Sequence, residues 1–335
     1  MKALNLYGIN DLRYEDVPMP ARKKGEVTLK IKASGICGSD ILRVYDKGAY
    51  HYPTIIGHEF SGQIIDADKK ELIGRKAAVF PLKPCFKCEA CKEFEYAQCH
   101  DYDYYGSRCD GGMAEYICVN EFNLVFMPDN LSYEEGALVE PCSVALHAIS
   151  QTKIKKGETV AVFGAGPIGC MLAMWAKALS AGHIILVDID QSKVDFAKSL
   201  GFDAVNPVNI NIEDYIKADV CIEGAGVPIT LEQAIKCAKN FGRVICMGNP
   251  AKDMNIPLKT YSLILRKQLH LIGTWNSSYS EKQNDWAKSL QAMSDGSINA
   301  LPLVSHRFKL SDNMKAFDLM KNGKEYYNKV MFINE

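Results

Sequence analysis

The 335-residue sequence contains no long apolar run, no tract of like charge and no low-complexity segment. A membrane-spanning helix needs about 20 consecutive apolar residues, and no stretch approaches that length. The sequence begins with MKALNLYGIND, which lacks the apolar centre of a secretory signal, so we expect a cytoplasmic protein. Its 39 basic and 40 acidic residues form no basic tract and no acidic tail, so we expect no nucleic-acid and no membrane partner.

The 12 cysteines are placed unevenly along the chain. A secreted disulfide scaffold is short and evenly stapled, whereas a tight cluster in a long chain is typical of metal binding. Four thiolates without an open position describe a tetrahedral structural zinc site, which shapes a loop and does no chemistry. A redox pair needs only two of the four, and iron–sulfur proteins generally use other spacings. The four clustered residues are Cys85, Cys88, Cys91 and Cys99.

The length favours two domains, and two kinds of pattern separate them. Up to about residue 145 the chain is rich in Gly, Pro and short β-type runs, such as Glu26–Ala33 and Lys76–Pro81. From there to about residue 279 buried strands alternate with helices, which predicts a doubly wound parallel sheet and an α/β fold class. The predicted strands are Thr159–Phe163, His183–Val187, Ala218–Ile222, Gly242–Met247 and His270–Thr274, and the predicted helices are Pro167–Leu179, Gln191–Leu200, Pro228–Ala238, Glu281–Ser294 and Asp312–Asn322.

A glycine-rich segment follows the first strand of this alternating region and opens its first helix. Gly164 permits a tight turn, Gly166 lets the backbone reach a pyrophosphate, and Gly169 lets helix and strand pack closely. The second strand ends at Asp188, whose carboxylate can accept hydrogen bonds from both ribose hydroxyls of NAD and would repel the 2′-phosphate of NADP. Strand, glycines, helix and acid in this order favour an NAD site over an ordinary turn. The cofactor-binding candidates are Gly164, Gly166, Pro167, Ile168, Gly169 and Asp188.

Three further segments carry residues that bind metals: CGSD with Cys37, GHEFSG with His58 and Glu59, and LVEP with Glu140. Cysteine, histidine and carboxylate together suit a zinc ion that keeps one position open for substrate. Each residue alone has an ordinary explanation, because a single cysteine usually packs as a small apolar residue, and the glutamate before a proline is usually at the surface.

These motifs in this order resemble those of the zinc-containing medium-chain dehydrogenases, and the resemblance covers nearly the whole chain. It implies a GroES-like, β-rich catalytic domain of residues 1–145 and 280–335, a Rossmann domain of residues 146–279 that binds NAD, and a homodimer or homotetramer. It places Cys37, His58 and Glu59 at a catalytic zinc. In the polyol dehydrogenase branch, Glu140 stands where alcohol dehydrogenases carry a second cysteine. Whether Glu59 or Glu140 contacts zinc directly stays open.

Two discriminating segments, YYGSRCDGG at 104–112 and GTW at 273–275, resemble the galactitol-1-phosphate 5-dehydrogenases of that branch. The resemblance implies oxidation of galactitol 1-phosphate by NAD to a keto-sugar phosphate such as tagatose 6-phosphate. By the family pattern, the Ser39 hydroxyl accepts the substrate proton. The substrate candidates are Arg43 and Arg108 for the phosphate, because an arginine can grip phosphate with paired hydrogen bonds, and Trp275 and Asn276 near the nicotinamide. Core packing is the alternative for Trp275.

Alternatives to this substrate remain. An unphosphorylated polyol dehydrogenase of the sorbitol, L-iditol or butanediol type shares the zinc motifs, and threonine dehydrogenase would need a site for a charged amino acid. A zinc-free quinone reductase or a non-catalytic nucleotide-binding protein belongs to a different class. The combination of Cys37, His58 and Glu59 argues against that class, because such proteins lack the zinc ligands.

Overall fold

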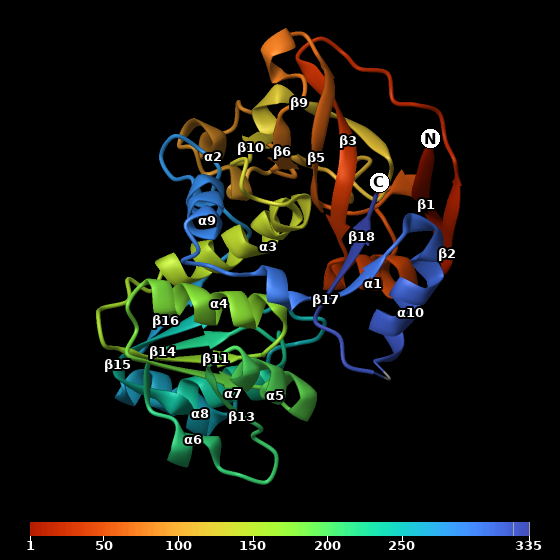
Figure 1. The fold of residues 1–335 in the computed structure, drawn as a ribbon. Helices are drawn as coiled ribbons and strands as arrows, with labels where there is room; N and C mark the ends of the chain where they lie inside the picture. The colour runs from red at the N-terminus through yellow and green to blue at the C-terminus, as the bar shows by residue number, and fades with distance from the viewer. Residues whose placement is uncertain (324, 335) are drawn as a thin grey trace. The chain divides into compact units, whose positions relative to one another are not determined.

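The computed structural model describes residues 1–323 and 325–334 and divides into two compact units (Figure 1). The first unit comprises Met1–Ser143 together with Ser278–Glu335, and the second comprises Val144–Ser277. These divisions fall two residues before the boundaries expected from the sequence, at 143 rather than 145 and at 277 rather than 279. Helix α3 (Tyr133–Ser150) runs through the first division, so no change in composition marks it.

The first unit is built from β-sheets with short helices between them. One sheet has the strand order β10-β6-β5-β3-β18-β17, and β9 also pairs with β3. A second sheet has the order β2-β1-β4, and a third consists of β7 and β8. The strands are β1 (Lys2–Gly8), β2 (Asp11–Asp16), β3 (Glu26–Gly35), β4 (Thr54–Ile55), β5 (Glu59–Ala67), β6 (Lys76–Val79), β7 (Leu82–Lys83), β8 (Asp103–Tyr104), β9 (Tyr116–Asn120), β10 (Leu124–Phe126), β17 (Val304–Phe308) and β18 (Lys329–Ile333). The helices and helical turns are α1 (Gly38–Leu42), η1 (Arg43–Lys47), η2 (Lys70–Leu72), α2 (Glu89–Lys92), η3 (Tyr96–Gln98), η4 (Glu121–Asn123), α3, α9 (Asp285–Ser294), η5 (Leu301–Leu303), η6 (Leu310–Asp312) and α10 (Asn313–Asn322).

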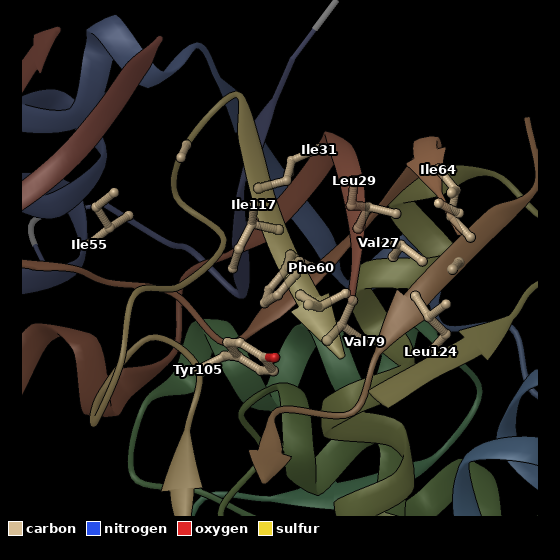
Figure 2. Close-up of a cluster of buried hydrophobic side chains, with 14 of the residues drawn as sticks. Val27, Leu29, Ile31, Ile55, Phe60, Ile64, Val79, Tyr105, Ile117 and Leu124 are labelled. Atoms are coloured by element: carbon tan, nitrogen blue, oxygen red, sulfur yellow. The ribbon is translucent and has the colours of Figure 1, made fainter. Parts of the chain in front are cut away.

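Alternation along β3 shows how the sequence forms the core of this unit. Every second residue of a strand faces the same side, so Val27, Leu29 and Ile31 share one face of β3. That face points into the core, and all three residues are fully buried. Figure 2 shows these side chains gathered with Phe60 and Val79 from the neighbouring strands. Strand β18, from the far end of the chain, pairs antiparallel with β3 and so fixes the C-terminal segment to this sheet.

The second unit is a six-stranded parallel sheet with helices on both faces. The strands are β11 (Thr159–Phe163), β12 (His183–Val187), β13 (Asp203–Val205), β14 (Ala218–Glu223), β15 (Ala238–Cys246) and β16 (His270–Gly273), and the helices are α4 (Pro167–Ala178), α5 (Gln191–Ser199), α6 (Ile212–Tyr215), α7 (Pro228–Cys237) and α8 (Leu258–Arg266). Figure 1 shows α4 on one face of the sheet and α7 and α8 on the other. The strand order β13-β12-β11-β14-β15-β16 reverses between β11 and β14, where doubly wound sheets bind their ligands.

The predicted α/β class, with a β-rich domain and a doubly wound parallel sheet, is confirmed. The strands predicted at Thr159–Phe163 and His183–Val187 have those bounds in the structure. The helix predicted at Glu281–Ser294 is wrong in its first turn and begins at Asp285, because the Asn284 side chain caps that end by accepting from the Ala287 N–H at 2.8 Å. None of the helices in the described part of the chain has the length and apolar character to cross a membrane.

Candidate metal and nucleotide sites

The sheet of the first unit brings three predicted metal ligands together. One ligand atom from each of Cys37, His58 and Glu59 lies within 4.8 Å of the other two. Cys37 caps the N-terminus of α1 just after β3, and Glu59 begins β5. Antiparallel pairing of these strands sets Gly35 opposite Glu59, so segments about 20 residues apart meet at one point. A thiol, an imidazole and a carboxylate are zinc ligands, so this group fits the metal that the sequence predicts.

Asp40 is a site residue to which the sequence assigned no role. Its buried carboxylate accepts from the Cys37 N–H at 3.0 Å and from Arg43 at 3.0 Å, and lies 3.6 Å from Nδ1 of His58. Burial opposes the charge of Asp40, but His58 and Arg43 outweigh it and lower the pKa of the carboxyl. A carboxylate behind a metal-binding histidine fixes the orientation of its ring. At 3.6 Å the contact is longer than a hydrogen bond, and His58 Nδ1 has no hydrogen-bond partner among the described residues, so Asp40 acts on His58 through its negative charge.

Lys329 is a second residue that the sequence reasoning missed. Its ammonium group donates to both carboxylate oxygens of Glu59, at 2.6 and 2.8 Å, and both side chains are buried. A side chain at Gly35 would overlap the Glu59 carboxylate, so the glycine makes room for this ion pair. The two charged residues are 270 positions apart in sequence, and the pairing of β3 with both β5 and β18 brings them together. The charge of the buried Glu59 carboxylate is therefore compensated within the protein.

Glu140 lies in the middle of α3, immediately before Pro141, and is only 6% exposed. A glutamate before a proline usually lies at the surface, and for Glu140 that expectation is wrong. Glu140 accepts a hydrogen bond from the Tyr104 hydroxyl at 3.3 Å. Burial raises the pKa of Glu140 to about 7, while the charge of His58 opposes that rise. Glu140 falls outside the group of three ligand atoms within 4.8 Å, but it is near enough to interact electrostatically with His58 and Glu59.

The loop before His58 is held by the segment that ends the YYGSRCDGG motif. The Gly111 N–H donates to the Ile55 carbonyl at 2.7 Å, and the Gly112 N–H donates to the Gly57 carbonyl at 2.8 Å. The Asp110 carboxylate accepts from the Ile55 N–H at 2.9 Å. This part of the motif therefore places the histidine, which gives it a structural role that the sequence alone did not show.

The remaining predicted residues have different surroundings. Ser39 is exposed on α1, two residues after Cys37. Arg43 pairs with Asp40, whereas the guanidinium of Arg108 contacts the rings of Tyr50 and Tyr102.

Trp275 and Asn276 belong to the second unit. Trp275 follows β16 and is 51% exposed, so core packing is wrong for it. The Asn276 side chain accepts from the Ser277 N–H at 2.8 Å, which holds the turn after the strand.

The four clustered cysteines form a separate lobe, with their sulfur atoms within 4.8 Å of one another. The sulfurs of Cys85 and Cys91 are 3.9 Å apart, which is too far for a disulfide bond. A tetrahedral zinc with bonds of about 2.3 Å would set its sulfurs about 3.8 Å apart, so the lobe fits zinc. The backbone N–H of Lys87 lowers the pKa of Cys85 to about 6, whereas burial raises the pKa of Cys91 to about 12 and also raises that of Cys99, so of these three only Cys85 favours the thiolate without a metal.

The glycine-rich loop between β11 and α4 has the geometry expected of a phosphate-binding turn. Gly164 has φ +113°, which side chains rarely adopt, and a side chain at Gly169 would overlap the Gly164 carbonyl. Pro167 and Ile168 form the first turn of α4. The Asp188 carboxylate accepts from the N–H groups of Ala165 at 2.8 Å and Asp190 at 2.9 Å. Asp188 therefore fixes the glycine-rich loop to the end of β12. Its binding of the ribose stays a prediction.

Glu223, at the end of β14, is a buried carboxylate that the sequence reasoning also missed. One of its oxygens accepts from the N–H groups of Ala225 and Gly226 at 2.8 and 2.7 Å, and from the Thr230 hydroxyl at 2.7 Å. The neighbouring Gly224 N–H donates to the carbonyl of Phe163, the residue before the glycine-rich loop, at 3.0 Å. Glu223 therefore shapes the loop on the other side of the point where the strand order reverses.

Comparison with known proteins is consistent with both sites. The GroES-like domain of alcohol dehydrogenases matches residues 23–129, and the zinc-binding dehydrogenase family matches residues 167–295. This chain belongs to the zinc-binding medium-chain dehydrogenases. The predicted resemblance is thereby confirmed.

Three relatives indicate where in the family the chain lies. Galactitol 1-phosphate 5-dehydrogenase of Escherichia coli is 35% identical over 92% of this chain and 93% of its own. Sorbitol dehydrogenase of Bombyx mori is 34% identical over 95% of this chain and 94% of its own. The crystal structure of the E. coli galactitol-1-phosphate dehydrogenase matches with a TM-score of 0.92 and 32% identity over the whole of both chains. Polyol dehydrogenases with and without a phosphorylated substrate are thus similarly related to it.

The predicted cofactors, zinc and a nicotinamide dinucleotide, are confirmed at the level of the family. A zinc-binding dehydrogenase from Sinorhizobium meliloti, 26% identical over 99% of both chains with a TM-score of 0.91, is bound to NADP. An alcohol dehydrogenase from E. coli, 26% identical over 100% of this chain and 99% of its own with a TM-score of 0.92, is complexed with NADH. The fold therefore accommodates either dinucleotide.

Proposed function

We propose that this enzyme transfers a hydride from a sugar alcohol phosphate to NAD, with galactitol 1-phosphate and a keto-sugar phosphate such as tagatose 6-phosphate as the substrate pair. The observation that carries the proposal is the group of Cys37 with the buried His58 and Glu59, beside a buried Glu140. The similarity to a galactitol 1-phosphate 5-dehydrogenase over 92% of the chain supports the choice of substrate.

Cys37, His58 and Glu59 would hold zinc, and Glu140 would be a fourth ligand through a carboxylate oxygen or would accept a hydrogen bond from a water bound there. Zinc, when bound, lowers the pKa of a substrate hydroxyl, and NAD, when bound, accepts the hydride. Lys329 balances the charge of Glu59, and Asp40 keeps a negative charge 3.6 Å from Nδ1 of His58.

The substrate proton needs an acceptor outside this group. We propose that Ser39, exposed on α1 two residues after Cys37, takes the proton and passes it to the cofactor ribose and water. Leu42 stands where alcohol dehydrogenases often carry a histidine, so the relay ends at the ribose. A Ser39→Ala variant with an unchanged rate of hydride transfer would remove this role.

NAD rather than NADP is proposed from Asp188, whose carboxylate lies beside the glycine-rich loop. Its negative charge would repel a 2′-phosphate at the adenosine ribose. Trp275 and Asn276, after β16, are proposed to contact the nicotinamide or the substrate, since ligands of such sheets collect beyond the strand C-termini.

We also propose a cytoplasmic homodimer. Among the described residues, no strand pairs with the outer side of the edge strand β16, on which Leu271 is 40% exposed. Leu258 and Leu265 on α8 are 84% and 62% exposed. Exposed apolar side chains beside a free sheet edge favour pairing with a second copy.

The deciding experiment measures kcat/KM for a panel of hexitols and hexitol phosphates, each with NAD and with NADP. The zinc-loaded enzyme should prefer a hexitol 1-phosphate over the same hexitol, and NAD over NADP. Preference for sorbitol or another free polyol would favour the sorbitol dehydrogenase alternative, which the Bombyx mori relative supports. Light scattering on the same preparation tests the homodimer, which a monomeric mass would contradict.

A further inference from the structure

The guanidinium of Arg108 is in contact with two aromatic rings. The central carbon of its guanidinium is 4.3 Å from the ring centroid of Tyr50 and 4.6 Å from that of Tyr102. An aromatic ring at this distance attracts a cation but, unlike a carboxylate, does not neutralise its charge. Within residues 1–323 and 325–334, no carboxylate forms an ion pair with this guanidinium.

The backbone on either side of Arg108 is anchored, so the guanidinium is presented by a defined turn. The Arg108 N–H donates to the Tyr104 carbonyl at 2.9 Å, and the Arg108 carbonyl lies 3.1 Å from Nε2 of His51. The other ring nitrogen of His51 is 3.0 Å from the hydroxyl of the buried Thr54. Loops 50–54 and 102–108 therefore carry the two tyrosines and the arginine as one assembly.

A row of rings connects this assembly to the metal ligands. The Tyr102 and Tyr104 rings lie 6.3 Å apart, and the Tyr104 and His58 rings lie 5.8 Å apart, both in edge contacts. The Tyr104 hydroxyl also donates to Glu140. A molecule whose hydroxyl reached the metal ligands could thus extend along these rings with its other end toward Arg108.

Arg43 is the other arginine near the metal ligands, and its surroundings differ. It pairs with the fully buried Asp40 at 3.0 Å, and only 13% of its side chain is exposed. That carboxylate already uses the charge of Arg43. A free anion would have to compete with Asp40 for Arg43, but would meet no such competitor at Arg108.

Building on the proposed function, we propose that the Tyr50–Arg108–Tyr102 stack binds the phosphate of the substrate. Contact with the two rings uses no N–H group of the guanidinium, so its N–H groups stay available for the paired hydrogen bonds that phosphate oxygens accept. The two rings hold the plane of the guanidinium in place before the substrate arrives, so little side-chain freedom is lost on binding. The ligand is a phosphomonoester at the end of a polyol chain. Arg108 sets specificity, and the two tyrosines are positioning residues.

The test compares the steady-state constants of Arg108→Gln and wild-type enzyme for a hexitol 1-phosphate and for the same hexitol without phosphate. Loss of charged hydrogen bonds should raise KM for the phosphorylated substrate about 10- to 100-fold. The value of kcat should stay within about twofold, because the phosphate is remote from the reacting carbon. Oxidation of the free hexitol should be unchanged. Inorganic phosphate should inhibit that oxidation in the wild type and lose this effect in Arg108→Gln.

Arg75→Gln is the matched control, because Arg75 also stacks on an aromatic ring, at 3.6 Å from Phe126, in the same unit. It should change neither substrate's constants. Tyr50→Leu, at an exposed position, should raise KM for the phosphorylated substrate about threefold and keeps the test valid if Arg108→Gln does not fold.

The outcomes separate the two proposals. If wild-type enzyme does not prefer the phosphorylated hexitol, the proposed function fails. If wild-type enzyme prefers it but Arg108→Gln affects both hexitols equally, or lowers kcat at constant KM, the phosphate-binding role of Arg108 fails while the proposed function stands. An equal rise in KM from Arg75→Gln would also overturn the role of Arg108.

Discussion

The four-cysteine lobe and the group of Cys37, His58 and Glu59 are both metal sites by their donor sets, but they are built in opposite ways. All ligands of the lobe lie between Cys85 and Cys99, and α2 and η3 form part of that segment. The other group joins β3, β5 and the loop between them, and takes its supporting residue Lys329 from β18. One site is local in sequence, and the other depends on the sheet.

Their charges differ as well. Four thiolates fill every position of a tetrahedral metal, so the lobe leaves no place for a substrate. The second group has fewer ligand atoms close together and is surrounded by buried ionisable groups, Asp40, Glu140 and Lys329. Burying so many charges is costly unless each is paired, and such arrangements cluster at sites that carry out chemistry. We therefore propose that the lobe shapes a loop and that the reaction takes place at the group of Cys37, His58 and Glu59.

Brief treatment with a chelator should produce the largest effect, because it should separate the two sites. We expect two zinc ions per chain in the purified enzyme and one after treatment, with complete loss of dehydrogenase activity and little change in Tm. The remaining zinc should be that of the lobe, since closed thiolate sites bind zinc with about 10–16 kcal/mol at neutral pH. Zinc content, activity and thermal unfolding measured on one sample check this outcome.

Two variants identify which ion leaves first. Cys37→Ser should be isolated with one zinc per chain, and the chelator should not remove it. Cys99→Ser should also be isolated with one zinc per chain, but the chelator should remove that ion. Loss of the lobe's zinc first, with activity retained, would show that the assignment of the two sites is reversed.

Lys329→Met should give the next largest effect, on the free energy of unfolding. It leaves Glu59 buried without its partner, and breaking a buried ion pair in this way costs about 3–5 kcal/mol. The measurement is urea denaturation at neutral pH. Adding Glu59→Gln to the variant should recover part of the loss, because the uncompensated charge is then gone.

Lys69→Met is the matched comparison at the surface. Lys69 pairs with Glu121 at 2.7 Å, but 60% of its side chain is exposed, so about 0–1 kcal/mol should be lost. Equal losses from Lys329→Met and Lys69→Met would mean that the buried pair does not stabilise the site.

The contrast between the two sites also explains what could be read from the sequence. The lobe was predictable in full, because its spacing is local and its ligands are all cysteines. Cys37, His58 and Glu59 were predictable as residue types, and so were strands β11 and β12, which come before the glycine-rich loop and after helix α4. Lys329 was not, because nothing in one sequence indicates that a lysine 270 positions away faces Glu59.

Helix α3 shows the same limit for secondary structure. Its apolar residues surround Glu140 and Pro141, and a proline in a helix interior removes one hydrogen bond, so the sequence gives a poor helix signal there. Packing decides the outcome, because the helix residues Ala137, Leu138 and Val139 are fully buried. The helix in turn buries Glu140, which a sequence pattern alone would place at the surface.

Asp40→Asn should give the smallest effect of the three and tests the contrast most finely. The metal ligands stay in place, and asparagine can still accept from the Cys37 N–H, but the negative charge behind His58 is lost. Losing a carboxylate that orients a zinc-binding histidine typically weakens metal binding about 10- to 100-fold. Activity measured over a series of zinc buffers gives the affinity directly. Asp46→Asn, at an exposed position on η1, should leave that affinity unchanged. The lobe's zinc should be retained equally in both variants, because neither aspartate touches it. A weakened lobe, or equal affinities in Asp40→Asn and wild type, would contradict the view that the second site depends on buried charges beyond its ligands.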